Sequence, residues 1–213
     1  MNEKEEAISP PNEYERRRAE KERVEKAKEN RKKFKRFVRL AVWLLIAAAL
    51  VYAIIALIKV SKPQGEDSSH QIPILNQEHI EVGSTPPGKY NSNPPTSGWH
   101  YQQTARNKFY DEPVPDQYLL HNLEHGDVWV AYHPRLSKEV KDVLKKFVST
   151  RVIASPRPGN ETDIALAAWG RLDAFNLEGA VLPENRINDF IKRYTNKGPE
   201  KIPLEAHGRL NFN

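Results

Sequence analysis

The sequence predicts a membrane-spanning helix followed by one small α+β domain with a mixed sheet. The first observation is a run of 19 apolar residues, 40–58, that contains no charge, Pro or Gly. The second is a later series of patterns in the order strand, helix, strand, strand, helix, which is typical of helices packed on one face of a sheet. The third is a cluster of prolines within 73–115, which favours a loop region at the start of the domain.

The apolar run is long enough to cross a bilayer. At 1.5 Å per residue it extends about 28 Å, close to the thickness of the hydrocarbon core. A cleaved signal peptide has an apolar core of about 7 to 15 residues, and this run continues well past Ala49, the last of three small residues that resemble a cleavage site. Residues 31–39 carry six Lys or Arg, so we expect a single-pass cell-membrane protein with its N-terminus in the cytoplasm.

Charge divides the chain into two unequal parts. Residues 1–39 hold 14 of the 33 Lys and Arg and nine of the 28 Asp and Glu, whereas the remaining residues hold 19 of each sign. This charged cytoplasmic segment contains opposite charges four residues apart, such as Glu13 and Arg17, which favour a solvated helix. It serves either as a topology signal or as a docking arm. The neutral outer part argues against binding to nucleic acid.

The domain after the membrane helix is predicted element by element. We expect a polar tether over 59–69 and a single extracytoplasmic domain over 70–213. The predicted strands are 127–133, 151–155 and 163–170, with a helix capped by Ser137 after the first strand and a last helix from about Pro183 to Gly198.

Metal chemistry in this chain is restricted to imidazole and carboxylate donors. There is no cysteine and Met1 is the only methionine, which excludes thiolate and thioether sites. His121 and His125 are four residues apart in LLHNLEHGD. If 116–125 is a helix, capped by Asp116 and ended by Gly126, the two imidazoles share a face and can share an ion; in a strand they would be about 13 Å apart.

His100 ends the segment KYNSNPPTSGWH (89–100), which reads either as a stiff loop that presents this histidine or as one that only packs Tyr90 and Trp99. The segments QEHIEVG, YNSNPPTSGWH and HNLEHGDVWVAYHP together resemble a family of bacterial single-pass membrane proteins, domain-of-unknown-function family 3105. The resemblance covers roughly 79–200, including ALAAWG and KGPE near the end, and this chain has Trp99 where the family usually has Pro.

The resemblance implies which histidines belong to the motif. His79, His100, His121 and His125 occupy motif positions together with Glu124, whereas His70 and His207 do not and His133 is intermediate.

Three functions follow from this pattern. The first is a non-enzymatic metal-binding module in which His79, His100, His121 and His125 hold Cu(II) or Zn(II), with Glu124 and Tyr90 as outer hydrogen-bonding partners. The second is a metal-dependent hydrolase with Glu124 as general base, which the absence of a nucleophile motif or recognisable substrate pocket disfavours. The third is a cell-surface interaction or scaffold domain with structural histidines. In each case residues 40–58 contact the lipid bilayer, and the sequence does not identify a protein partner.

Overall fold

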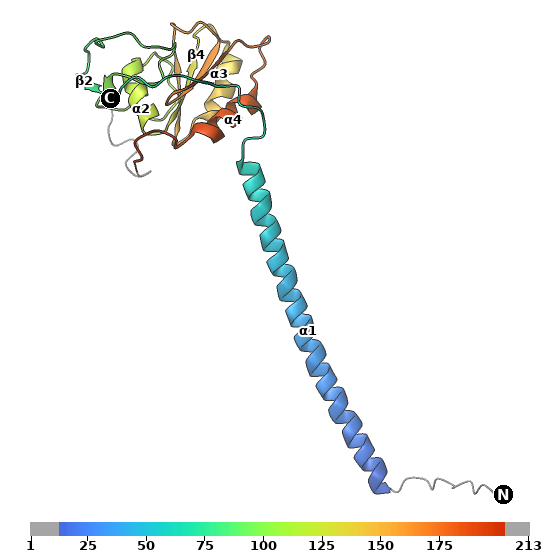
Figure 1. The fold of residues 1–213 in the computed structure, drawn as a ribbon. Coiled ribbons are helices and arrows are strands. Elements are labelled where there is room, and N and C mark those ends of the chain that lie inside the picture. The colour runs from blue at the N-terminus through green and yellow to red at the C-terminus, as the bar shows by residue number, and fades with distance from the viewer. Residues whose placement is uncertain (1–12, 203–213) are drawn as a thin grey trace, which may run out of the picture. The chain divides into compact units, whose positions relative to one another are not determined.

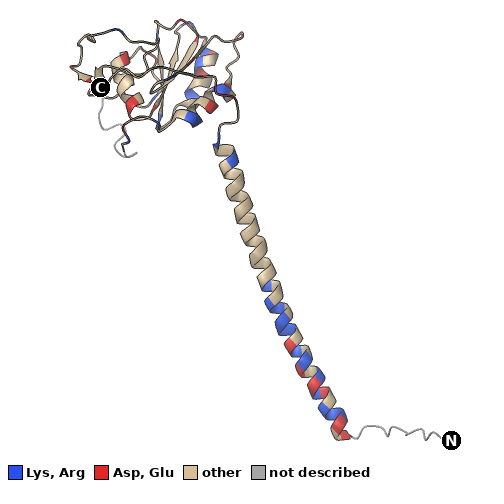
Figure 2. Cartoon of the chain, viewed as in Figure 1, with Lys and Arg blue, Asp and Glu red and all other residues tan. Residues whose placement is uncertain are grey.

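The computed structural model describes residues 13–202 and divides the chain into two compact units, 1–59 and 60–213 (Figure 1). The first unit is built on the helix α1 (Glu13–Ser61), which contains no buried residue. Its charged residues lie along the N-terminal part, and the following stretch up to Lys59 is uncharged (Figure 2). Among the described residues, α1 is the one helix long and apolar enough to cross a membrane.

The second unit is organised by a five-stranded mixed sheet. Its strand order is β1-β7-β6-β4-β5. β4 and β5 are parallel, and the other neighbouring strands are antiparallel, which confirms the predicted mixed sheet. The strands are β1 (His70–Gln71), β4 (Val128–Tyr132), β5 (Val152–Pro156), β6 (Ile164–Ala168) and β7 (Arg171–Phe175).

The connection between the parallel strands β4 and β5 is helical. It consists of α3 (Lys138–Leu144) and the short 3₁₀ helix η1 (Lys145–Phe147). The Ser137 hydroxyl accepts a hydrogen bond from the Val140 N–H at 3.4 Å, as expected for an N-cap. A parallel pair needs such a crossover, because its second strand must start at the same end of the sheet as the first.

The sheet is covered on both faces. Successive side chains of β4 alternate, so Val128, Val130 and Tyr132 join the apolar cluster that includes α3 and α4 (Glu184–Tyr194). Trp129 and Ala131 join the other cluster, which includes α2 (Asp116–Glu124). The two helices of the predicted strand and helix order, α3 and α4, share one face of the sheet as expected, whereas α2, which was not part of that order, lies on the opposite side (Figure 1).

The sequence prediction missed one strand, β7, and misplaced the end of the last helix. The strand β7 follows directly after β6, because Gly170 turns the chain with a φ of 66°. This strand is hard to recognise in the sequence because a charged residue, Asp173, occupies a buried position. Its carboxylate pairs with Arg186 at 2.6 Å. The last helix ends at Tyr194 rather than near Gly198, since Asn196 adopts a φ of 60° and its N–H donates to the Gly126 carbonyl at 2.7 Å.

Candidate metal centre

A second, two-stranded sheet brings two distant histidines together. β2 (His79–Ile80) and β3 (His100–Tyr101) are parallel, and in their register His79 lies opposite His100. Residues directly opposite on neighbouring strands have adjacent side chains. The imidazole rings of His79 and His100 accordingly lie with their centroids 4.7 Å apart.

The helix α2 supplies the remaining groups. Its first residue is Asp116, and Pro115 holds the cap position that the sequence reasoning gave to Asp116. The Asp116 carboxylate instead accepts from the Arg157 guanidinium at 2.9 and 3.0 Å, so the ion pair competes successfully with the capping role. Gly126, with a φ of 84°, ends the helix as predicted.

His121 and Glu124 lie one turn apart on α2 and face the two strands. One ligand atom from each of His79, His100, His121 and Glu124 lies within 4.8 Å of the others, so this group could hold a metal ion. The Oε2 atom of Glu124 is 2.9 Å from Nε2 of His100 and 3.9 Å from Nε2 of His79. Ligands of a tetrahedral ion are about 3.4 Å apart when each is about 2.1 Å from it, so small side-chain shifts suffice.

The His100 ring is fixed by its own loop. Its Nδ1 atom is 2.7 Å from the Gly98 carbonyl, which can only accept, so the ring proton on this side is held on Nδ1. The other nitrogen, Nε2, lies 2.9 Å from Oε2 of Glu124, a hydrogen bond that needs a proton between the two atoms and whose place a bound ion would take. Histidine ligands commonly donate their second N–H to a backbone carbonyl in this way, and this contact orients the ring toward the ion.

His121 is the least satisfied polar group in the cluster. It is 4% exposed, and its Nδ1 atom is buried without a hydrogen-bond partner among the described residues. Burial and then the neighbouring imidazoles of His125, His100 and His79 lower the pKa of His121 to about 4. The ring is therefore neutral near pH 7, the state in which an imidazole binds a metal.

Glu124 is ionised despite being buried. Burial opposes the charge, but the hydrogen bond with His100 and the adjacent imidazoles outweigh burial and hold the pKa of Glu124 below its usual value. The cluster therefore presents one buried carboxylate to three imidazoles. A buried charge of this kind is costly unless it is paired or coordinates a metal.

His125 does not join this group of four. Its ring lies against that of His121, with the centroids 4.4 Å apart, and its Nε2 atom is 3.3 Å from Oε2 of Glu200. His121, His125 and Glu200 form a second group that could hold an ion. Sequence reasoning missed Glu200, although it lies in the KGPE segment that contributed to the family resemblance.

The other predicted residues lie apart from both groups. The Tyr90 hydroxyl donates to the Trp99 carbonyl at 2.6 Å rather than to a clustered side chain, so it supports the loop. Nδ1 of His133 accepts from the Arg135 N–H at 3.1 Å, and His70 lies exposed in β1. His207 is outside the described residues.

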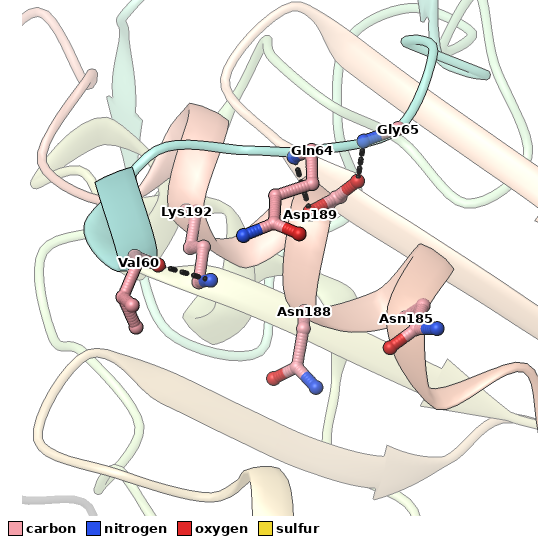
Figure 3. A pocket seen from close by; sticks show the side chains of 7 residues that line it. All are labelled: Val60, Gln64, Gly65, Asn185, Asn188, Asp189 and Lys192. Carbon is pink, nitrogen blue, oxygen red and sulfur yellow. Dashed lines mark hydrogen bonds between the residues drawn. The ribbon is translucent and has the colours of Figure 1, made fainter. Parts of the chain in front are cut away.

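Two hollows of the domain surface differ in their relation to the cluster. One, lined by 79–82 with Gln102 and Gln103, reaches the exposed edge of His79. The other is a polar pocket between Gln64 and Gly65 and the helix α4, where Asp189 accepts from both backbone N–H groups (Figure 3). None of the residues that line this second pocket belongs to the cluster.

The fold and the site together define the class of protein: an α+β domain with a buried His and Glu cluster able to hold a metal ion, preceded in the chain by one candidate membrane helix. The chain belongs to DUF3105, a family of proteins of unknown function whose family model matches residues 82–206. The matched stretch contains every cluster residue except His79. No curated protein and no solved structure matches this chain.

Proposed function

We propose that this protein is a membrane-anchored, extracytoplasmic module that binds one divalent transition metal ion, copper or zinc, through His79, His100, His121 and Glu124. The observation that carries the proposal is the buried Nδ1 atom of His121, which has no hydrogen-bond partner among the described residues. An ion held by the cluster offsets the cost of burying this unpartnered nitrogen beside a buried carboxylate.

The donor set supports the choice of metal. Three imidazoles and one carboxylate suit Zn(II) and Cu(II), and copper binds more tightly than zinc at most sites of this type. Calcium and magnesium are disfavoured, because they prefer sites made almost entirely of oxygen donors. The chain contains no cysteine that would favour soft metals.

The position of Glu124 supports a binding role over hydrolysis. A general base must reach a metal-bound water while it remains free of the metal. Here Oε2 of Glu124 lies 2.9 Å from Nε2 of His100 and 3.9 Å from Nε2 of His79, within the group of four potential ligands. It therefore supplies a fourth protein donor, which closes the coordination sphere and leaves no position for a reacting water.

The test is metal binding by the full chain in detergent, purified without a histidine tag and stripped with a chelator. Isothermal titration with Zn(II) or Cu(II) is expected to show a tight first ion. The matched pair of variants is His79→Ala and His70→Ala, since both histidines are exposed and begin two-residue strands. Only His79→Ala should lower the affinity for the first ion.

Two results would contradict this proposal. If the wild-type protein binds neither metal, the histidines have a structural role in a scaffold domain. If His79→Ala and His70→Ala bind the first ion with equal affinity, the ion lies elsewhere.

The topology is tested separately with the same chain. Because the sequence contains no cysteine, single introduced cysteines report sidedness without background. In intact cells a membrane-impermeant maleimide should label Ser68→Cys and leave Ala19→Cys unlabelled. The reverse pattern would place the domain in the cytoplasm.

A further inference from the structure

We propose a second cation subsite, formed by His121, His125 and Glu200, that shares His121 with the first site and makes the centre dinuclear. The inference rests on the proposed function, because it extends the same centre to a second ion of the same class. One ligand atom from each of these three residues lies within 4.8 Å of the others. His125 is 4% exposed, so one imidazole of the subsite is as deeply placed as His121.

The carboxylate of the second subsite is brought in by the KGPE segment, 197–200. The backbone N–H of Glu200 donates to the Glu124 carbonyl at 3.1 Å, which fixes this residue to the end of α2. Gly198 permits the approach, since a Cβ atom there would lie 2.1 Å from the Glu124 carbonyl oxygen. The Glu200 side chain then reaches Nε2 of His125 at 3.3 Å.

The two subsites differ in the number and exposure of their donors. The first has four, of which His100, His121 and Glu124 are buried. The second has three, and the Glu200 side chain is 52% exposed. We therefore expect the second ion to bind more weakly and after the first.

Sharing His121 has a chemical consequence. A neutral imidazole has one lone pair, because its other nitrogen carries a proton. For both ions to be bound at once, His121 must release that proton to solvent and bridge the ions as imidazolate through Nδ1 and Nε2. The second ion should therefore release one proton from His121, and two Cu(II) ions bridged in this way are magnetically coupled.

The experiment counts copper ions by elemental analysis after equilibrium dialysis of the full chain in detergent, and compares the count with the integrated Cu(II) paramagnetic resonance signal. The wild-type protein should bind two ions in two steps, with the signal falling below the copper count as the second ion binds. The variants Glu200→Gln and His125→Ala should each bind one copper ion, because they lack a ligand of the second subsite and retain every ligand of the first. Glu178→Gln, an exposed carboxylate outside the cluster, is the matched control and should behave as the wild type.

The outcomes separate this inference from the proposed function. If the wild-type protein saturates at one ion that His79→Ala weakens, the proposed function stands and the second subsite is refuted. If two ions bind but the signal equals the copper count throughout, His121 does not bridge them and the shared centre is refuted. Loss of the first ion in Glu200→Gln would also overturn the separation of the subsites.

Discussion

The metal-free protein should lose stability in mild acid because of His121. The folded protein holds the pKa of this residue at about 4, compared with 6.5 for an ordinary histidine, mainly through burial and then through its imidazole neighbours. Between these two values the unfolded chain binds a proton that the folded chain does not, so the free energy of unfolding falls as the pH is lowered from 6.5 to 4. The contribution is fully present above pH 6.5.

The size of the effect follows from the width of this window. One pKa unit corresponds to about 1.4 kcal/mol, so His121 alone should account for a loss of about 3 kcal/mol, which is large for a domain of ordinary stability. The lowered pKa of Glu124 adds a further loss in the same direction as the pH falls below the usual carboxyl value of 4.5.

Urea unfolding of the chelator-treated full chain, followed by tryptophan fluorescence, measures this loss. His121→Gln removes the titrating ring while keeping an amide of similar reach, so the difference between wild type and variant isolates the contribution of His121. Between pH 6.5 and 4.5 the free energy of unfolding of the wild type should fall more steeply than that of the variant. The difference in slope should correspond to about one additional proton bound on unfolding. Parallel pH profiles of the two proteins would refute the assigned cause.

Three further substitutions test other parts of the structure. Gly198→Ala should destabilise the domain by at least about 2 kcal/mol in urea unfolding, because its Cβ would collide with backbone, whereas Gly159→Ala, whose nearest neighbour would be at 3.6 Å, should change little. Asp173→Ala should cost about 2 kcal/mol by the same measurement, since it removes the charged hydrogen bonds between this buried carboxylate and Arg186, whose side chain is 36% exposed. Glu124→Gln should raise the dissociation constant of the first metal ion at least about tenfold in titration calorimetry.

Elements with a strong local pattern could be predicted from the sequence. The continuous apolar run predicts the helix in α1, and the β-branched and aromatic run at 127–133 corresponds to β4. The weak points were strands too short to show a period. β1, β2 and β3 have two residues each, and their pairing depends on contacts between segments far apart in the chain.

The position of α2 illustrates a second limit. Its apolar residues predict burial, but they do not say against which face of the sheet the helix packs. Trp129 and Ala131 decide this, because they point away from α3 and leave an apolar surface that α2 covers. A strand buried on both faces therefore carries the information that a third layer exists, and the unbroken apolar run of β4 was the available signal.

The division of the histidines between two groups follows from helix geometry. Each residue of an α-helix turns by about 100° around the axis, so residue i+3 lies about 60° to one side of residue i and residue i+4 about 40° to the other. Glu124 and His125 are therefore separated by about 100° around α2, with His121 between them.

The sequence prediction gives both histidines of α2 to one ion, because residues four apart lie on the same face of a helix. In the structure, Glu124 lies on one side of His121 and contacts His100 and His79. His125 lies on the other side and contacts Glu200. Among the described residues of the helix, His121 is thus the one side chain that belongs to both groups. Its substitution should impair binding of both ions, whereas Glu200→Gln should impair binding of the second ion only.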